Sequence, residues 1–217
     1  MTRRRALAWA RLLLGLWLFA AGVVLGLRSG LGVSPWDVLH DGIRQVTPLS
    51  FGVATVLVGV VLVAVTFAAG IRPGPGTLAN MVAIGLFADA MLATGIARDL
   101  HGGPLPLRLA AVVAGVGLVA LGSALYIGAG LGSGPRDSLM LAISSRARAR
   151  VGLVRALIEG SALAAGWLLG GAAGVGTILY AFGIGPAIEL AFKLLRVELP
   201  ARPDPGTGGR ECACAES

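Results

Sequence analysis

Charged residues are scarce in this sequence: Asp, Glu, Lys and Arg make up 13% of its 217 residues, while hydrophobic residues make up 56%. That argues against a soluble domain, which needs far more charge to cover its surface. Alternation of apolar and polar residues is also missing from the apolar runs, which argues against a membrane β-barrel. The sequence has instead continuous apolar runs long enough to cross a bilayer as helices, at 51–69, 107–127 and 151–171. We therefore predict an all-α polytopic membrane protein.

Motifs for catalysis or metal binding are missing too. The two histidines are His40 and His101, and the two cysteines are Cys212 and Cys214. No Walker loop, HExxH or GxSxG motif occurs, so we expect neither an enzyme nor a cofactor. The cysteines lie in a polar, Pro- and Gly-rich tail at 200–217 that we expect to be disordered. Two thiolates without a nearby histidine make half a metal site, so reduced cytoplasmic thiols are the favoured interpretation.

The net charge of +7 is clustered beside the apolar segments. Arginines precede the first apolar run, at 3–5, and alternate through one loop, at 146–150. Such clusters mark the cytoplasmic ends of membrane helices and do not indicate nucleic-acid binding. The first apolar run, at 6–27, is long and lacks a small-x-small cleavage site, which favours a retained span over a signal peptide. We predict a multi-pass plasma-membrane protein in contact with the lipid bilayer, with both termini in the cytoplasm.

The sequence repeats itself at an offset of 100 positions. GLGVSPWDVL at 30–39 matches GLGSGPRDSLM at 130–140, and GPGT at 74–77 matches GVGT at 174–177. Glycine is abundant, so some glycine pairs arise by chance, but the matched proline, aspartate and threonine positions do not fit chance. A duplication of this length predicts two copies of one structural unit.

We place the two repeats at 1–105 and 106–199. Each repeat is predicted to contain three transmembrane helices and one short helix, at Pro35–Gln45 and Pro135–Ser145. Proline suits the first turn of a helix, and aspartate there complements the positive helix end. A helix of 11–13 residues reaches about 17–20 Å, against roughly 30 Å of hydrocarbon, so a re-entrant or interfacial half-helix is favoured.

Two alternatives stay open for the short helices. Each phrase can be a capped turn at the bilayer surface, with Trp36 as an interfacial anchor. If the short helices do not cross, each repeat has three spans and the second repeat is inverted relative to the first. If they do cross, each repeat has four spans and the repeats are parallel. The arginine clusters lie in the cytoplasm in both cases, and helix length favours six spans and an inverted pair.

The two matched segments at 30–39 and 130–140 form the predicted solute site. Broken helices at matching positions of two repeats are typical of transporter binding sites, where half-helix N-termini face the solute. Arg136 stands where the first repeat has Trp36, and a cation at a helix start favours an anionic or carboxylated solute. Asp137 could instead neutralise Arg136 and remove that preference. The predicted substrate-binding residues are Gly30, Gly32, Trp36, Asp37, Gly130, Gly132, Arg136 and Asp137.

Four ionisable residues within predicted spans are candidates for a functional role, because charge there is costly and often functional. Asp89 and Glu189 occupy matching positions about 18 Å along their helices. They are candidates for carrying protons or a cation; the alternative is a place near the far interface, or pairing with an arginine. Arg155 and Glu159 are one helical turn apart and are predicted to pair.

The phrases GLGVSPWDVLHDGI, RPGPGTLANMVAIGLFAD, GLGSGPRDSLMLAI and GWLLGGAAGVGTILYAFGIGP together resemble the YczE/YyaS/YitT group of bacterial integral membrane proteins. The similarity is greatest to YczE-like members and covers nearly the whole chain before about residue 199. The resemblance implies a plasma-membrane protein of a widespread family whose molecular activity is largely uncharacterised. It brings no established active-site residues.

The sequence leaves two functions open. The first is a small secondary transporter or channel-like permease for a small, anionic solute. The second is a membrane scaffold or regulator that binds another membrane protein through small-residue faces. Those faces carry Gly22, Gly26 and Gly30, and Gly166, Gly170 and Gly174. A homo-oligomer is a further open alternative.

Overall fold

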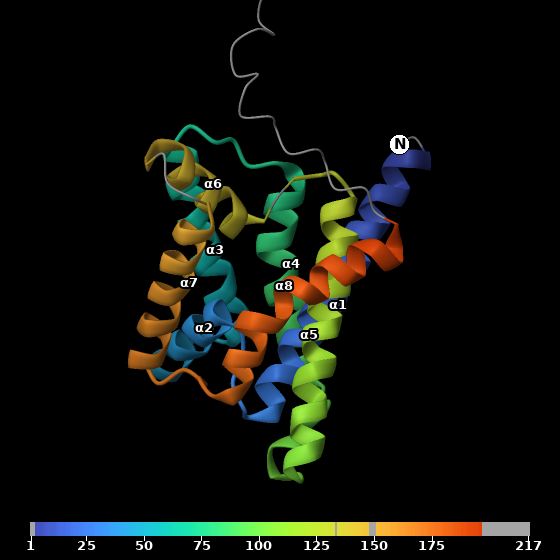
Figure 1. Ribbon diagram of the computed structural model, residues 1–217, viewed down its shortest axis with the longest axis vertical. Coiled ribbons are helices and arrows are strands. Elements are labelled where there is room, and N and C mark those ends of the chain that lie inside the picture. The colour runs from blue at the N-terminus through green and yellow to red at the C-terminus, as the bar shows by residue number, and fades with distance from the viewer. Residues whose placement is uncertain (1–2, 133, 148–150, 197–217) are drawn as a thin grey trace, which may run out of the picture.

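The computed structural model describes residues 3–132, 134–147 and 151–196 (Figure 1). Within these ranges the chain is helical and contains no strand. The helices run in the order α1 (Arg3–Ser29), α2 (Pro35–Val46), α3 (Phe51–Ala68), α4 (Pro75–Ala93), the 3-10 helix η1 (Arg98–Gly102), α5 (Leu105–Gly128), α6 (Pro135–Ala147), α7 (Val151–Leu168) and α8 (Val175–Leu195).

Five of the described helices are long and apolar enough to cross a membrane, namely α1, α3, α4, α5 and α8. Large apolar side chains on their outer surfaces are exposed, as lipid contact requires; Val61 is 60% and Phe182 80% exposed. The 18-residue α7 is not among the five. The count of six spans therefore stays a prediction, while the polytopic helical class is confirmed.

The glycine-proline phrases form the chain reversals that their sequence indicates. Gly30 and Gly130 follow α1 and α5 with φ of 62° and 67°, and Gly32 and Gly132 have φ of 110° and 132°, a backbone conformation that favours glycine. Pro35 then begins α2, with Ser34 as its N-cap. The short helices contain 12 and 13 residues, close to the expected length.

The centre of the bundle is an antiparallel contact between α1 and α5. A Cβ at Gly15 would lie 2.7 Å from the carbonyl oxygen of Gly122, and one at Gly22 would lie 2.5 Å from that of Gly115. In the reverse direction, a Cβ at Gly122 would lie 2.5 Å from the Gly15 carbonyl oxygen, and one at Gly115 would lie 2.8 Å from that of Gly22. The missing side chains therefore let the two backbones touch, and the four glycines are two pairs at an offset of 100.

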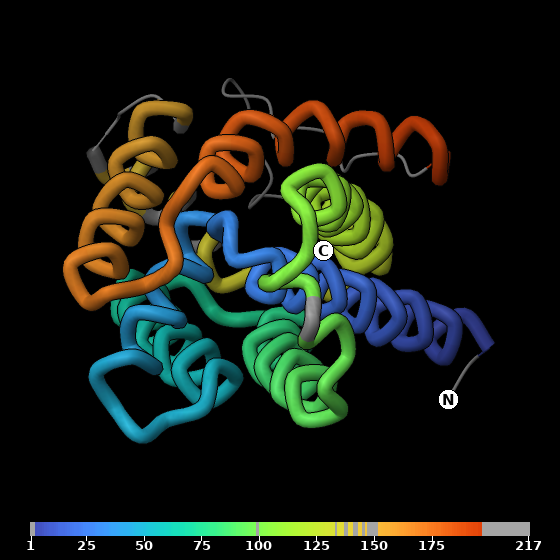
Figure 2. Tube along the Cα trace, turned by 90° about the horizontal axis from the view of Figure 1, so that it is seen from below, coloured from blue at the N-terminus to red at the C-terminus, as the bar shows by residue number. Residues whose placement is uncertain are grey.

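α4 and α8 flank this central pair, while α2, α3 and α7 lie to one side of it (Figure 2). α4 packs against α1 and α3, and α8 packs against α5. α2 packs against α7 and α3, while α6 packs against α3 and α7, so each short helix lies against helices of both halves. Tyr180 of α8 is buried in the core and donates a hydrogen bond to the Gly22 carbonyl of α1 at 3.0 Å.

The connections between helices lie at two ends of the bundle. Figure 1 shows the start of α1 and the α3–α4 connection at one end, and the α7–α8 connection at the other. α8 also contains Pro186, where the matching residue of α4 is Leu86. A proline inside a helix removes one backbone hydrogen bond and favours a kink.

Candidate functional site: a pocket between the two short helices

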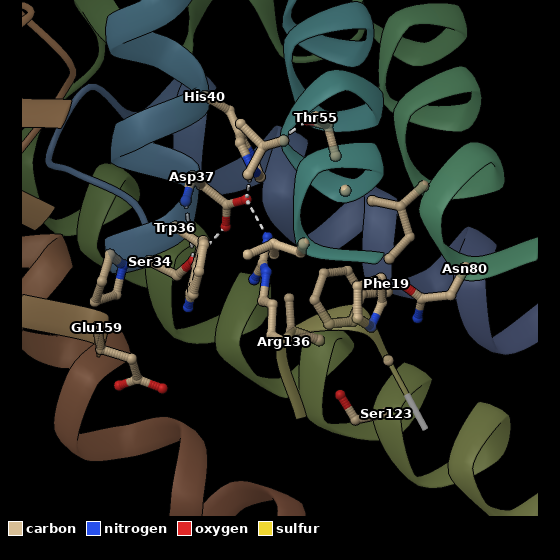
Figure 3. A pocket seen from close by; sticks show the side chains of 18 of the residues that line it. Phe19, Ser34, Trp36, Asp37, His40, Thr55, Asn80, Ser123, Arg136 and Glu159 are labelled. Carbon is tan, nitrogen blue, oxygen red and sulfur yellow. Dashed lines mark hydrogen bonds and ion pairs between the residues drawn. The ribbon is translucent and has the colours of Figure 1, made fainter. Parts of the chain in front are cut away.

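The candidate site is a pocket of about 170 Å³ lined by residues of both halves of the chain. The starts of α2 and α6 both contribute to its wall, through Ser34–Asp37 and Gly134–Arg136. The two phrases that stand 100 positions apart in the sequence therefore meet at one cavity (Figure 3).

The pocket wall is built largely from matched positions. Eleven pairs of lining residues differ in number by 100: Phe19/Val119, Ser34/Gly134, Pro35/Pro135, Trp36/Arg136, His40/Met140, Thr55/Arg155, Val58/Ile158, Gly59/Glu159, Asn80/Tyr180, Met81/Ala181 and Ile84/Ile184. Both members of each apolar pair are apolar, although Phe19/Val119 and Met81/Ala181 differ in size, whereas the polar pairs differ in type. The wall thus combines apolar residues at matched positions with different polar groups on its two sides.

Asp37 organises the side of the pocket that α2 supplies. It is 3% exposed, and its carboxylate accepts a hydrogen bond from the Ser34 hydroxyl. His40, one turn further along α2, places Nδ1 3.5 Å from the Asp37 Oδ1 and 3.2 Å from the Thr55 Oγ1. The His40 ring also packs edge-on against Phe51. These contacts fix the carboxylate and the imidazole in one orientation.

Arg136 reaches across from α6 to this cluster. Its guanidinium carbon lies 5.0 Å from the centroid of the Trp36 ring, within cation–π distance. One guanidinium nitrogen, Nη2, lies 3.9 Å from the Asp37 Oδ1, an ion-pair distance that is too long for a hydrogen bond. The Arg136 side chain is 30% exposed, so the cation remains accessible from the pocket. Figure 3 shows Arg136 pointing toward Asp37.

Arg155 and Glu159 lie on the α7 side of the same pocket. Arg155 Nε donates to Glu159 Oε1 at 2.9 Å, which is the pair that their spacing predicts. Both side chains are more exposed than Asp37, at 51% and 30%. The pocket therefore contains two guanidinium groups and two carboxylates.

Gly32 and Gly132 contact the GxGT segment of the opposite half of the chain instead of lining the pocket. The Gly176 N–H donates to the Leu31 carbonyl at 2.7 Å, and the Gly76 N–H donates to the Leu131 carbonyl at 2.9 Å. A Cβ at Gly32 would lie 2.6 Å from Thr177 Oγ1. In the same way, a Cβ at Gly132 would lie 3.0 Å from Thr77 Oγ1. Gly30 and Gly130 are turn residues outside the wall.

Asp89, on α4, contacts the start of α3 and does not line the pocket. It accepts hydrogen bonds from the Ser50 hydroxyl and, at 2.8 Å, from the Gly52 N–H. A carboxylate there satisfies an otherwise unpaired donor of the first helical turn. Its counterpart Glu189 is exposed on α8. The side chain of Asp137 lies outside the described part of the protein.

Seven polar lining residues were not among the predicted site residues: Ser34, His40, Thr55, Asn80, Ser123, Tyr126 and Tyr180. His40 carries a usable signal, because it follows Asp37 by three positions and shares its helix face. Asn80 and Tyr180 stand at matching positions three residues after the paired threonines. Among the described residues, no group of three or more His, Cys, Asp or Glu side chains could hold a metal ion.

The helices, the apolar outer surface and the internal pocket define an integral membrane protein of the polytopic helical class. Residues 5–193 match the model of a family of unknown function (DUF6198), and the chain belongs to this family. The match, together with a relative named as an uncharacterised membrane protein YczE, confirms the resemblance to YczE-like membrane proteins that the sequence predicts.

Curated relatives agree with that assignment. The chain is 35% identical to the uncharacterised membrane protein YczE of Bacillus subtilis over 92% of this chain and 89% of that one. It is 35% identical to an uncharacterised protein of Haemophilus influenzae over 88% and 86% of the two chains. The identity to the uncharacterised protein YyaS of Bacillus subtilis is 29%, over 76% and 83%. No solved structure matches significantly.

Proposed function

We propose that this protein is a small secondary transporter or permease, and that the pocket between α2 and α6 binds its solute. The observation that carries the proposal is the composition of the wall: matched residues of both halves line one cavity at the starts of two short helices. In transporters built from repeats, such a position between two broken helices is where solutes bind.

The proposed architecture is a pair of inverted repeats with six spans. Three observations support it. The central helices α1 and α5 touch in antiparallel orientation through matched glycines. The bonds from Gly176 to Leu31 and from Gly76 to Leu131 are equivalents of each other. The α3–α4 and α7–α8 connections lie at opposite ends of the bundle (Figure 1). With the arginine-rich N-terminus in the cytoplasm, the α3–α4 connection and the C-terminus are cytoplasmic as well.

The proposed solute is a small organic anion. A dry cavity of roughly 150 Å³ accommodates benzene, so about 170 Å³ suits a solute with on the order of six to ten non-hydrogen atoms. Arg136 is accessible and held in place by the Trp36 ring, and a guanidinium binds carboxylates through two parallel N–H donors. The apolar pairs of the wall would contact the body of the solute.

The experiment is binding and uptake by purified protein in liposomes, screened over monocarboxylates of three to eight carbons. Arg136→Gln removes the accessible cation while keeping a polar side chain of similar length. We expect it to reduce anion affinity at least tenfold, because a charge-assisted pair in a buried site is worth over 1.4 kcal/mol. Arg146→Gln is the matched control, since Arg146 lies at the other end of α6 and donates to the Ala69 carbonyl.

The alternative is a membrane scaffold or regulator that does not transport. One observation favours it: Asp89 caps α3 instead of facing the pocket, so this intramembrane carboxylate has a structural role. A scaffold would bind none of the carboxylates, and its cellular phenotype would be unaffected by Arg136→Gln. These two results together would contradict the transporter proposal and support the scaffold.

A further inference from the structure

The two halves differ in how their last two helices pack. In the first half, α3 and α4 form an extensive interface. Among the described residues of the second half, α7 and α8 form no comparable interface, although α8 keeps its contact with α5 just as α4 keeps its contact with α1. Figure 2 shows α8 running away from the end of α7 toward α5. The second half therefore has a gap where the first half has a helix–helix contact.

Three features hold α3 and α4 together. A Cβ on Gly52 would lie 2.2 Å from the Gly85 carbonyl oxygen, so the backbones touch at this pair. Gly59 leaves room for the Met81 side chain, whose Cβ is 3.5 Å from the position of a Cβ on Gly59. Asp89 of α4 accepts the Gly52 N–H at the start of α3.

The second half contains residues that match each of these three features, but α7 and α8 do not make the corresponding contacts. Gly152 and Gly185 match the touching glycines, and each has no heavy atom within 4 Å of an added Cβ. Glu159 and Ala181 match Gly59 and Met81, so each pair combines one large and one small residue, with the sizes exchanged between the halves. Gly152 is the second residue of α7, so its N–H has no partner within the helix. The acceptor equivalent to Asp89 is the exposed Glu189.

The gap bears on the pocket because both helices line it. Arg155, Ile158 and Glu159 come from α7, and Tyr180, Ala181 and Ile184 come from α8. Since these helices do not pack together, the pocket wall is incomplete between them. Pro186 follows Gly183 and Gly185 in α8 and provides a place where this helix can bend, which α4 lacks.

We propose that α8 swings onto α7 to reproduce the packing of α3 on α4, and that Glu189 is the gating residue that holds the closed state. In that state Gly152 meets Gly185, Ala181 meets Glu159, and the Glu189 carboxylate accepts the Gly152 N–H. The closure seals the α7–α8 side of the pocket. The statement that the sealed pocket holds a solute rests on the proposed function. The movement of α8 onto α7 does not, because it follows from the packing of the helices.

The test is a pair of disulfides in membrane vesicles, with Cys212 and Cys214 replaced by serine. The pair Gly59→Cys with Met81→Cys is the matched control, because its Cβ separation of 3.5 Å falls within the range for a disulfide. The reporting pair is Glu159→Cys with Ala181→Cys. We expect the control to cross-link completely and the reporting pair to cross-link steadily on oxidation. A control that cross-links while the reporting pair never does would overturn the proposal.

A second reporting pair, Ala156→Cys with Gly185→Cys, leaves the Arg155–Glu159 pair intact and uses two exposed positions. The role of Glu189 is tested by measuring cross-linking in the protein that carries Ala156→Cys and Gly185→Cys. Glu189→Gln keeps an acceptor for the Gly152 N–H, and we expect little change in cross-linking. Glu189→Leu removes the acceptor, and we expect a loss of roughly three- to tenfold. Equal cross-linking in Glu189→Leu and the parent would exclude Glu189 as the gating residue.

This experiment separates the gate from the transported solute. Cross-linking of the reporting pairs with no uptake of any carboxylate would support the gate and count against the proposed function. Uptake that Arg136→Gln abolishes, without cross-linking of either reporting pair, would support the function and remove the gate.

Discussion

Asp37 joins more of the pocket's polar groups than any other residue of the described wall. It contacts Ser34, His40 and Arg136 from a nearly inaccessible position. Its carboxylate both stabilises the start of α2 and partly compensates the charge of Arg136. These two roles can be separated, because asparagine keeps the shape and one acceptor but not the charge.

We predict that Asp37→Leu lowers the free energy of unfolding by about 2–4 kcal/mol, since it leaves buried polar partners unpaired. Asp37→Asn should fold nearly as well and bind organic anions severalfold more tightly, because Arg136 then lacks a nearby negative charge. Thermal unfolding in detergent and binding in liposomes measure the two effects. Weaker anion binding by a well-folded Asp37→Asn protein would contradict the assignment of Arg136 as the anion's partner.

For single residues, the sequence predicts part of the pocket wall but not the contacts of every intramembrane charge. Trp36, Asp37 and Arg136 were found because proline and aspartate mark a helix start twice. The contact between Asp89 and Gly52 was not found, because a carboxylate within an apolar run has the same signature whether it binds a solute or caps a neighbouring helix. Only the position of the neighbouring helix distinguishes these cases.

At the scale of single helices, α1 and α5 depend on glycine at their crossing. We predict that Gly22→Ala or Gly122→Ala lowers the free energy of unfolding by about 1–3 kcal/mol, because the new Cβ would lie 2.5 Å from a backbone oxygen of the other helix. Thermal unfolding monitored by fluorescence-detected gel filtration gives the measurement.

Gly117→Ala is the matched control on α5, since no heavy atom lies within 4 Å of its added Cβ. It should be neutral or slightly stabilising, by up to about 1 kcal/mol, because alanine has the higher helix propensity. If both kinds of variant unfold at the same temperature, the close crossing of α1 and α5 does not contribute to stability.

The helix boundaries were largely predictable, and the helix partners were not. The start of α2 at Pro35 and its end near Gln45 follow from local capping and proline chemistry. The 3-10 helix Arg98–Gly102 and the packing of α2 on α7 had no signal in the sequence. The packing of α2 on α7 brings together residues far apart in the sequence, such as Leu39 and Gly166, and local patterns carry no information on such pairs.

At the scale of the whole molecule, the proposed inverted arrangement predicts opposite locations for the α3–α4 and α7–α8 connections. Single cysteines at Pro73 and Ala173, in a background without Cys212 and Cys214, would be probed with an impermeant thiol reagent. We expect position 173 to react from outside the cell and position 73 only after the membrane is opened. Arg3→Cys is a cytoplasmic control that should behave like position 73. Equal labelling of 73 and 173 from outside would establish parallel repeats.

The crossed bonds from Gly176 to Leu31 and from Gly76 to Leu131 have an evolutionary consequence. Neither half contains both members of either bond, so a chain of half this length could form them only with a second copy of itself. If the halves arose by duplication and are inverted, as proposed above, that copy would have to enter the membrane in the opposite orientation, which requires nearly balanced flanking charge. Fusion of the two copies would then fix one orientation for each half. It would also let the halves diverge, as at the matched positions Trp36 and Arg136.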